Sequence, residues 1–301
     1  MAQATNFRAG FVALLGQPNA GKSTLLNMLL GEKVSIVSEK PQTTRNRITG
    51  ILTTKEAQVV FVDAPGTLKS TSGINTYLQE EVADVIDNAD VLAILLGADM
   101  GEEGSKELVS LAKRSKKPWF VVITKSDLLG GTRTPKYFQW LLDEQIPFVA
   151  ISAMKRKDEA REEFMNRLMP LLPLSPAPLY EEDLYTTQTV RQMSAEFIRE
   201  ACFEHLQQEI PYGLAIRINE FKEDLPIPRI RAEIVIEKEN HKAIVIGAKG
   251  QTIKKIGMTA RKEIERVVGD QVFLELHVHV KENWTRNPRV MKELGYVVQK
   301  D

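Results

Sequence analysis

The sequence predicts a doubly wound α/β domain followed by a smaller α+β module. Its 301 residues exceed the usual size of one domain. Several short apolar runs are continuous, as in strands buried on both faces of a parallel sheet. These runs are Phe11–Leu15, Val59–Val62, Val91–Leu96, Trp119–Ile123 and Phe148–Ile151. The pattern changes after a proline-rich stretch at 170–178, so we expect domains at 1–178 and 179–301.

The segments between the apolar runs are long enough for crossover helices. Ile48–Thr54 is less apolar and lies close to Val59, which predicts an edge strand in a hairpin with the next strand. Beyond the prolines, residues 187–208 have a helical pattern with Val190, Met193, Phe197 and Ala201 on one face. The expected elements after it are strands at Leu214–Phe221 and Arg231–Glu237, a helix at Thr252–Val268 and a strand at Val272–Val280.

The composition excludes wholesale disorder and fibrous repeats, with 43% hydrophobic and 27% charged residues. The 40 basic and 40 acidic residues balance, but residues 241–301 carry a net charge of +5. Such a basic segment binds a polyanion or is simply a solvated surface. The single cysteine, Cys202, excludes a disulfide framework and a cysteine-based zinc site, and we expect a buried thiol in a cytoplasmic, reducing compartment. No apolar run approaches the ~20 residues of a membrane span.

A glycine-rich loop follows the first predicted strand and precedes a helical pattern. It matches the G-x-x-x-x-G-K-[ST] motif, in which backbone N–H groups and the helix N-terminus bind phosphates. We expect Lys22 to reach the β- and γ-phosphates and the Ser23 hydroxyl to bind Mg²⁺. The expected phosphate-binding residues are Gly16, Gln17, Pro18, Asn19, Ala20, Gly21, Lys22, Ser23 and Thr24.

The tetrapeptide Asp63-Ala64-Pro65-Gly66 ends the Val59–Val62 run. A carboxylate at Asp63 can hold Mg²⁺ through water, and the Gly66 N–H can sense a γ-phosphate. The position of this segment, at the end of a core strand after the phosphate loop, favours that role over an ordinary turn.

Two further segments end buried strands and suit a guanine base. In Thr124-Lys125-Ser126-Asp127, the Asp127 carboxylate can accept two hydrogen bonds from guanine, whereas adenine lacks that donor pair. The stem of Lys125 can lie over the base. Ser152-Ala153-Met154 would offer backbone N–H groups to the guanine oxygen.

The basic C-terminal part contains the short loop Gly247-Ala248-Lys249-Gly250, preceded by Ile246 and followed by Lys254 and Lys255. A G-x-x-G loop alone is often a simple turn. With an apolar flank and a basic helix it predicts a KH domain, whose loop holds about four single-stranded nucleotides. His277 and His279 share a strand face, where they are surface histidines or, with a further ligand, a metal site.

With these motifs in this order, nearly the whole chain resembles the Era family, bacterial KH-domain GTPases of small ribosomal subunit assembly. The most telling strings are Gly16–Ser23, Pro41–Arg45, Lys242–Gly250, Glu282–Trp284 and Leu294–Tyr296. The resemblance implies a P-loop GTPase domain with a type II KH domain. Its implied partners are GTP and GDP, the small ribosomal subunit and the single-stranded 3′ end of its RNA. It also implies peripheral membrane association, although no amphipathic anchor is evident here, and we expect a monomer.

The resemblance also assigns roles to individual residues. The first switch loop would contain Gln42–Arg45, with Thr44 as a Mg²⁺ ligand and Thr43 as the alternative. Relatives with asparagine at the position of Asn19 can bind K⁺ beside the phosphates. The residues expected to act in catalysis are Lys22, Asn19, Thr44 and Gly66, and those expected to hold the metal are Ser23, Thr44 and Asp63.

The chain departs from the family pattern at two positions: Thr124 replaces the usual asparagine, and Ala64 replaces a common threonine. We expect guanine preference to survive the change at Thr124 with somewhat altered affinity. We expect little effect at Ala64, because the side chain there is not needed for the metal or phosphate contacts. Thr67 and Leu68 follow Gly66, where signalling GTPases place a glutamine that orients water. This predicts slow intrinsic hydrolysis, on the order of 10⁻³ s⁻¹ or below.

The leading hypothesis is a switch in which GTP occupancy sets the disposition of the RNA module. Two rivals stay open. One is a GTPase whose KH-like module binds a protein or a membrane surface, and the other is an ATP-dependent assembly factor.

Overall fold

The computed structural model describes residues 6–38, 40, 43–66, 73–129 and 134–296. Its contacts divide the chain into two compact units. The first holds Met1–Ser35, Thr44–Lys69 and Leu78–Thr187, and the second holds Ile36–Thr43, Ser70–Tyr77 and Gln188–Asp301. Two short segments from the first half of the chain are therefore grouped with the C-terminal residues, which the linear sequence does not indicate.

The first unit is built on a six-stranded sheet in the order β2-β3-β1-β4-β5-β6. All neighbours pair in parallel except β2 and β3, which form the predicted hairpin. The strands are β1 (Arg8–Gly16), β2 (Ile48–Thr53), β3 (Ala57–Asp63), β4 (Val91–Gly97), β5 (Trp119–Thr124) and β6 (Phe148–Ala150). The continuous apolar runs lie in these parallel strands, as predicted.

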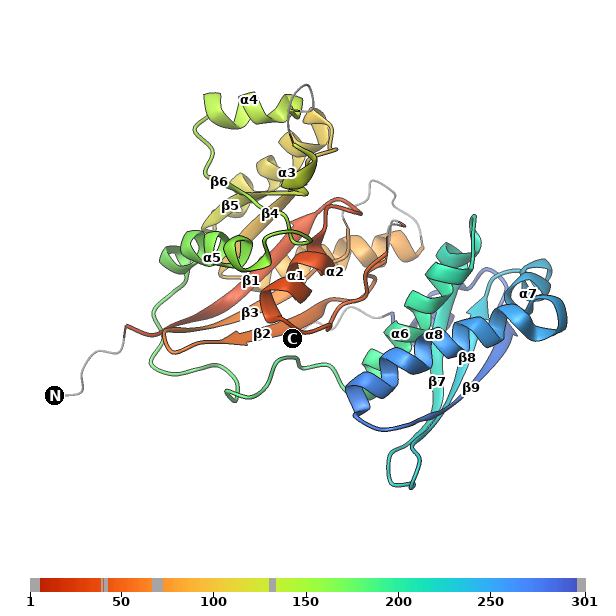
Figure 1. Cartoon of the computed structure of the whole chain (residues 1–301). Helices are drawn as coiled ribbons and strands as arrows, with labels where there is room; N and C mark the ends of the chain where they lie inside the picture. Colours follow the sequence, from red (N-terminus) through yellow and green to blue (C-terminus); the bar gives the residue numbers. More distant parts are fainter. Residues whose placement is uncertain (1–5, 39, 41–42, 67–72, 130–133, 297–301) are drawn as a thin grey trace. The chain divides into compact units, whose positions relative to one another are not determined.

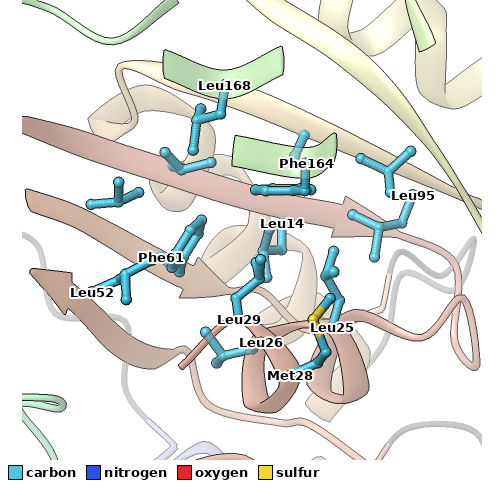
Figure 2. Packing of buried hydrophobic residues seen from close by; sticks show 14 of the residues in the cluster. Leu14, Leu25, Leu26, Met28, Leu29, Leu52, Phe61, Leu95, Phe164 and Leu168 are labelled. Atoms are coloured by element: carbon cyan, nitrogen blue, oxygen red, sulfur yellow. The ribbon is translucent and has the colours of Figure 1, made fainter. Parts of the chain in front are cut away.

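Helices cover both faces of this sheet because successive strand residues point to opposite sides. One face packs against α1 (Lys22–Leu30) and α5 (Lys157–Leu168), and Figure 2 shows Leu25, Leu29 and Phe164 among the side chains of that core. The other face packs against α2 (Ile74–Asn88), α3 (Glu102–Ser115) and α4 (Lys136–Asp143). The doubly wound prediction is confirmed.

This topology decides where polar residues gather. The carboxyl ends of parallel strands meet at one edge of the sheet, where open α/β folds bind their ligands. The loops after β1, β3, β5 and β6 leave from that edge, and they contain the four motifs predicted to bind a nucleotide.

The second unit has a three-stranded sheet in the order β7-β8-β9, with β7 antiparallel and β9 parallel to the central strand. The strands are β7 (Leu214–Lys222), β8 (Arg229–Ile236) and β9 (Phe273–Val280), and the helices are α6 (Val190–His205), α7 (Glu239–Ile246), α8 (Gln251–Val268) and α9 (Pro288–Glu293). Helices α6 and α8 lie side by side on one face of the sheet (Figure 1).

The core of this unit follows the two periodicities of its elements. Met193, Phe197 and Ala201 of α6 are buried, whereas Val190 is half-buried. In β9, Leu274, Leu276, Val278 and Val280 pack against the core, as the alternating pattern predicts. Helix α6 begins with a capping box: the Thr189 hydroxyl accepts from the Gln192 N–H, and the Gln192 side chain accepts from the Thr189 N–H. Such a cap contributes about 1 kcal/mol.

Helix α7 was not predicted. Its last residues, Ile244, Val245 and Ile246, are β-branched, and eight residues are too few for a clear helical period. Only His241 and Val245 are buried on this helix, because it presents a single narrow stripe to the core. With α7 the chain order is helix, strand, strand, helix, helix, strand, which is the α+β arrangement expected for the second domain.

Candidate nucleotide and nucleic-acid sites

The phosphate loop connects β1 to α1, and its glycines are required by close approaches and by backbone geometry. A Cβ on Gly16 would lie 2.9 Å from the Leu95 carbonyl oxygen, so only glycine fits there. Gly21 is the N-cap of α1 with φ of +86°, in the left-handed region. Asn19 also has a positive φ of +63°. The Ala20 N–H donates to the Gln17 carbonyl, which closes the turn.

Lys22 is the first residue of α1 and is 6% exposed. Its ammonium donates to the carbonyl oxygens of Gly16 (3.1 Å) and Gln17 (3.2 Å), so the side chain folds back over the loop. Burial lowers the pKa of Lys22, and the Asp63 carboxylate opposes that effect. A buried ammonium at the N-terminus of a helix is a fitting partner for phosphate oxygens.

Asp63, at the end of β3, is fully buried and uses its two carboxylate oxygens differently. Oδ2 accepts from the hydroxyls of Ser23 (2.7 Å) and Ser35 (3.0 Å), and Thr44 Oγ1 lies at 3.5 Å. The Ser23 and Thr44 hydroxyls are 3.1 Å apart. Oδ1, by contrast, is a buried atom for which the described part of the chain offers no hydrogen-bond partner.

This donor set fits Mg²⁺, which prefers hard oxygen ligands such as hydroxyls and carboxylates. Burial raises the pKa of the Asp63 carboxyl, while Lys22 and the three hydroxyls lower it. An anion held in a dry site with one oxygen unused is suited to a cation or to its bound water. Ser23, Thr44 and Asp63, the expected metal residues, therefore lie together.

The structure distinguishes Thr44 from Thr43, the two candidates for the Mg²⁺ ligand in the first switch loop. Thr44 lies beside Ser23 and Asp63, whereas the Thr43 hydroxyl donates to the Lys40 carbonyl at 2.7 Å. Gln42 and also Thr67 and Leu68 lie outside the described residues. Gly66 approaches the phosphate loop so closely that a Cβ would lie 2.8 Å from the Pro18 nitrogen. Ala64 is fully buried.

The predicted base-reading segments lie next to each other. The Ser152 hydroxyl donates to Asp127 Oδ1 at 2.7 Å, and this bond is the main reason that the pKa of Asp127 is lowered. Thr124 donates from Oγ1 to the Ala20 carbonyl at 2.7 Å, which ties β5 to the phosphate loop. Lys125 pairs with Asp99 (Nζ to Oδ2, 3.0 Å), and Met154 is 74% exposed.

Three side chains in this region were not predicted: Asn27, Ser35 and Asp99. Asn27 lies one helical turn after Ser23, so the two share a face of α1, and this spacing is the only signal that the sequence carries. Ser35 lies in the segment that follows α1, and Asp99 follows β4, where nothing in the local sequence indicates their partners.

The G-x-x-G loop joins α7 to α8. A Cβ on Gly247 (φ +74°) would lie 2.2 Å from the Thr252 hydroxyl oxygen, so this position requires glycine for both space and geometry. Gly250 has φ of +75° with open space around it. Ala248 and Lys249 are exposed, as are Lys254 and Lys255 in the first turns of α8. Ile246 is half-buried, while its neighbour Ile244 is 52% exposed.

His277 and His279 are exposed on the sheet face opposite the core. The His277 ring lies 2.9 Å from the Glu275 carboxylate. Across the described residues, no group of three or more histidine, cysteine or acidic side chains is arranged to hold a metal ion. Cys202 is buried and free, as predicted.

Family models match both units of the chain. A model described as a 50S ribosome-binding GTPase matches residues 11–125, and a KH domain model matches residues 209–285. Among curated proteins, GTPase Era of Thermoanaerobacter sp. (strain X514) is 40% identical over 97% of this chain and 98% of its own length. GTPase Era of Geobacter metallireducens is 39% identical over 96% and 98%, respectively.

Two solved structures are similar to the chain over 97% of its length. One is Era in complex with MgGDPNP and nucleotides 1506–1542 of 16S ribosomal RNA (TM-score 0.89, 36% identity). The other is a variant of Aquifex aeolicus Era bound to GDP and AlF₄⁻ (TM-score 0.88, 36% identity). Both matches include the whole of the compared chain. The P-loop domain, the KH domain and the match to these relatives over nearly the full length of the chain all agree. The chain belongs to the Era family of GTPases.

Proposed function

We propose that this protein binds GTP and GDP with Mg²⁺, hydrolyses GTP slowly, and binds the single-stranded 3′ end of small-subunit ribosomal RNA as a switch in assembly of that subunit. The observation that carries the proposal is the Asp63 cluster beside the phosphate loop: three hydroxyls gather around one carboxylate oxygen, and the other oxygen is buried without a partner. The Era relative solved with MgGDPNP and ribosomal RNA supports both halves of it.

In this proposal the chain's own groups position the substrate and neutralise its charge. Ser23, Thr44 and Asp63 hold Mg²⁺, which supplies charge compensation for the β- and γ-phosphates. Lys22 leaves the loop carbonyls and donates to phosphate oxygens, while the Gly66 N–H binds the γ-phosphate. Water then attacks in line. Slow turnover follows because the residue after Gly66 is threonine, which has no side-chain carboxamide, as glutamine has, to orient that water.

Guanine selectivity belongs to Asp127, held by Ser152. Replacing Asp127 with asparagine exchanges an acceptor for a donor, which opposes the guanine amino group and suits the C2 oxygen of xanthine. We expect Asp127→Asn to lose GTP affinity on the order of 10³-fold or more in calorimetry and to gain affinity for xanthosine triphosphate.

Asp99→Asn is the matched control, since it neutralises a neighbouring carboxylate that contacts Lys125 instead of the base. It should keep the preference for GTP over ATP. If ATP competes with GTP in the unmodified protein, the guanine assignment fails and the ATP-dependent assembly factor is favoured.

Asn19 is the residue that we assign to a K⁺ ion beside the phosphates. Its left-handed backbone lies at the turn of the phosphate loop, where a second cation can offset charge on the leaving group. We expect GTP turnover to be faster in K⁺ than in Na⁺, and Asn19→Ala to remove the difference. Equal turnover in the two ions would contradict the assignment.

RNA binding is assigned to the G-x-x-G loop and the start of α8: Ile246, Gly247, Ala248, Lys249, Gly250, Lys254 and Lys255. Lys249, Lys254 and Lys255 are exposed for phosphate contacts, and the two positive-φ glycines allow close approach of a sugar–phosphate backbone. The net charge of +5 over residues 241–301 favours a polyanion over a neutral partner.

The test replaces Ala248 and Lys249 with aspartate and measures binding of a short single-stranded ribosomal RNA 3′ end over a range of salt concentrations. Both the affinity and its salt dependence should fall. The slope of log K against log salt concentration should become shallower by about one unit for each lost phosphate contact. Lys262→Asp, about two turns beyond Lys255 on α8, is the control and should bind as the unmodified protein does. Unchanged RNA binding in the loop variant would favour a protein or membrane partner.

None of the helices in the described residues is long and apolar enough to cross a membrane. We propose a cytoplasmic monomer that associates with the inner face of the cell membrane at most peripherally. We also propose that the domains divide at 178/179, whereas the contacts group residues up to Thr187 with the first unit. Limited proteolysis of the full chain would check this: cleavage next to 178/179 supports the proposal, and cleavage confined to 187/188 contradicts it.

A further inference from the structure

We propose that Ser35, held in place by Asn27, is a positioning residue that orients the Asp63 carboxylate toward the Mg²⁺ of the bound nucleotide. This inference rests on the proposed nucleotide site and adds two residues to it. Neither residue contacts the substrate in this proposal, and both act through Asp63.

The first step is the bond that Ser35 makes. Its side chain is fully buried, and its hydroxyl donates to Asp63 Oδ2 at 3.0 Å. Ser23 donates to the same oxygen at 2.7 Å. A carboxylate with two donors on one oxygen is fixed in rotation, so its other oxygen has a fixed direction. That oxygen, Oδ1, is the buried atom with no partner among the described residues.

The second step is how Ser35 is itself held. Asn27 Oδ1 accepts from the N–H groups of Val34 (3.0 Å) and Ser35 (2.9 Å), and Asn27 Nδ2 donates to the Ser35 carbonyl (2.7 Å). One amide side chain thus satisfies three backbone groups, two of them on the serine itself and one on the residue before it. Such a bracket leaves the Ser35 hydroxyl little freedom to turn away from Asp63.

The third step is the shared support. Ser23 and Asn27 lie four residues apart on α1, so they are stacked on one face of the helix. Ser23 reaches Asp63 directly, and Asn27 reaches it through Ser35. Two successive turns of one rigid helix therefore fix a single carboxylate, which is the arrangement expected of groups that orient a metal ligand.

Ser35 and Thr44 contact Asp63 in different ways. Ser35 lies in the segment that follows α1 and is hydrogen-bonded both to Asp63 and to Asn27. Thr44 Oγ1 lies at the longer distance of 3.5 Å from Asp63 Oδ2 and 3.1 Å from the Ser23 hydroxyl. In this proposal Ser35 therefore orients the carboxylate, and Thr44 is left to bind the metal.

The experiment measures release of a fluorescent GDP analogue from the full chain, with Mg²⁺ titrated and separately with excess EDTA. Mg²⁺ slows release, and the concentration that gives half of this effect is the quantity compared. We expect Ser35→Ala to raise that concentration about 10-fold, because a hydrogen bond to a charged group is lost. Release in EDTA should stay within about twofold of the unmodified protein, since Asp63 orientation matters only to the metal.

Three further variants sharpen the result. Asn27→Ala should shift the Mg²⁺ titration in the same direction, and the double variant should be no worse than the more affected single one, because both act through one bond. Ser105→Ala is the matched control: Ser105 is also fully buried, but its hydroxyl donates to the carbonyl of Gly101, the N-cap of α3. It should leave both measurements unchanged. Ser35→Cys, with a weak donor of similar size, replaces the alanine variant if that one does not fold.

The outcomes are distinct. Equal acceleration of release with Mg²⁺ and with EDTA would mean that Ser35 is merely structural and would overturn the inference, as would an unshifted Mg²⁺ titration. If the unmodified protein binds no guanine nucleotide at all, the proposed function fails instead.

Discussion

Thr124 shows how one hydroxyl can connect two motifs that are distant in sequence. It ends β5, and its Oγ1 donates to the carbonyl of Ala20, which lies 104 residues earlier in the phosphate loop. The acceptor is a backbone atom, so the bond depends on the donor's position and not on the side chain at residue 20. A threonine at the start of the base-reading segment can therefore brace the loop with the one donor that it has.

We predict that Thr124→Ala weakens binding of GDP by about 5- to 10-fold, because a buried neutral hydrogen bond contributes about 1 kcal/mol. The preference for guanine should persist, since Asp127 is untouched. Calorimetry with GDP and ADP checks both statements. Thr124→Ser, which keeps the donor, should restore most of the affinity; failure of that rescue would mean that the methyl group and not the hydroxyl supports the loop.

At the scale of elements, the outer face of the β7-β8-β9 sheet is charged across all three strands. Arg231 on β8 bonds Glu275 on β9 (2.9 Å) and lies 3.2 Å from Glu220 on β7. The hydrogen bond from Arg231, followed by that from His277, lowers the pKa of Glu275 below its ordinary 4.5. The pKa of Glu220 is lowered chiefly by its hydrogen bond with Lys222. Because these groups are open to solvent, each pair contributes little.

The sign of the pH effect follows from these shifts. A carboxyl whose pKa is lower in the folded state stabilises that state above its unfolded pKa, and the effect is lost as the pH falls through the folded value. We predict that Arg231→Leu reduces the hydrogen-exchange protection of β8 amides at about pH 6, and that its difference from the unmodified protein shrinks steadily as the pH falls below the ordinary glutamate pKa of 4.5. A difference that stays constant with pH would show that Arg231 acts through packing.

At the scale of the whole molecule, Cys202 reports on the cooperativity of the second unit. The thiol is fully buried on α6, and burial raises its pKa to about 12. Both the missing access and the scarcity of thiolate make it inert in the folded state. We predict that a thiol reagent at about pH 8 labels it only as fast as the unit opens, far more slowly than it labels the denatured chain.

A helix-cap variant tests whether labelling of Cys202 requires the second unit to open. Thr189→Ala removes the cap of the helix that carries Cys202, which costs about 1 kcal/mol and should raise the labelling rate about fivefold. Cys202→Ala controls for other reactive groups. If the cysteine reacts at the rate of a free thiol in the unmodified protein, the second unit is open in solution and its core is not as packed as described.

Much of the fold could be predicted because its signals are local. Continuous apolar runs indicated the strands of the first unit, and the hairpin of β2 with β3 followed from their short separation. The short α7 could not be predicted, since a run of β-branched residues in an eight-residue element has no decisive period. The grouping of residues 36–43 and 70–77 with the second unit depends on packing between distant segments, which a local sequence pattern does not indicate.

The sequence by itself determined the two loop motifs: phosphate loops and G-x-x-G loops are made by glycines at fixed spacing, which set backbone direction within a few residues. Only the tertiary structure decided how Asp63 divides its two oxygens, that Thr44 and not Thr43 lies beside it, and that Asn27 and Ser35 support it. The physical reason is range. A backbone cradle is specified by neighbours in the chain. The hydrogen bond between Ser35 and Asp63 joins residues 28 positions apart and exists only after the segment that follows α1 has packed against the end of β3.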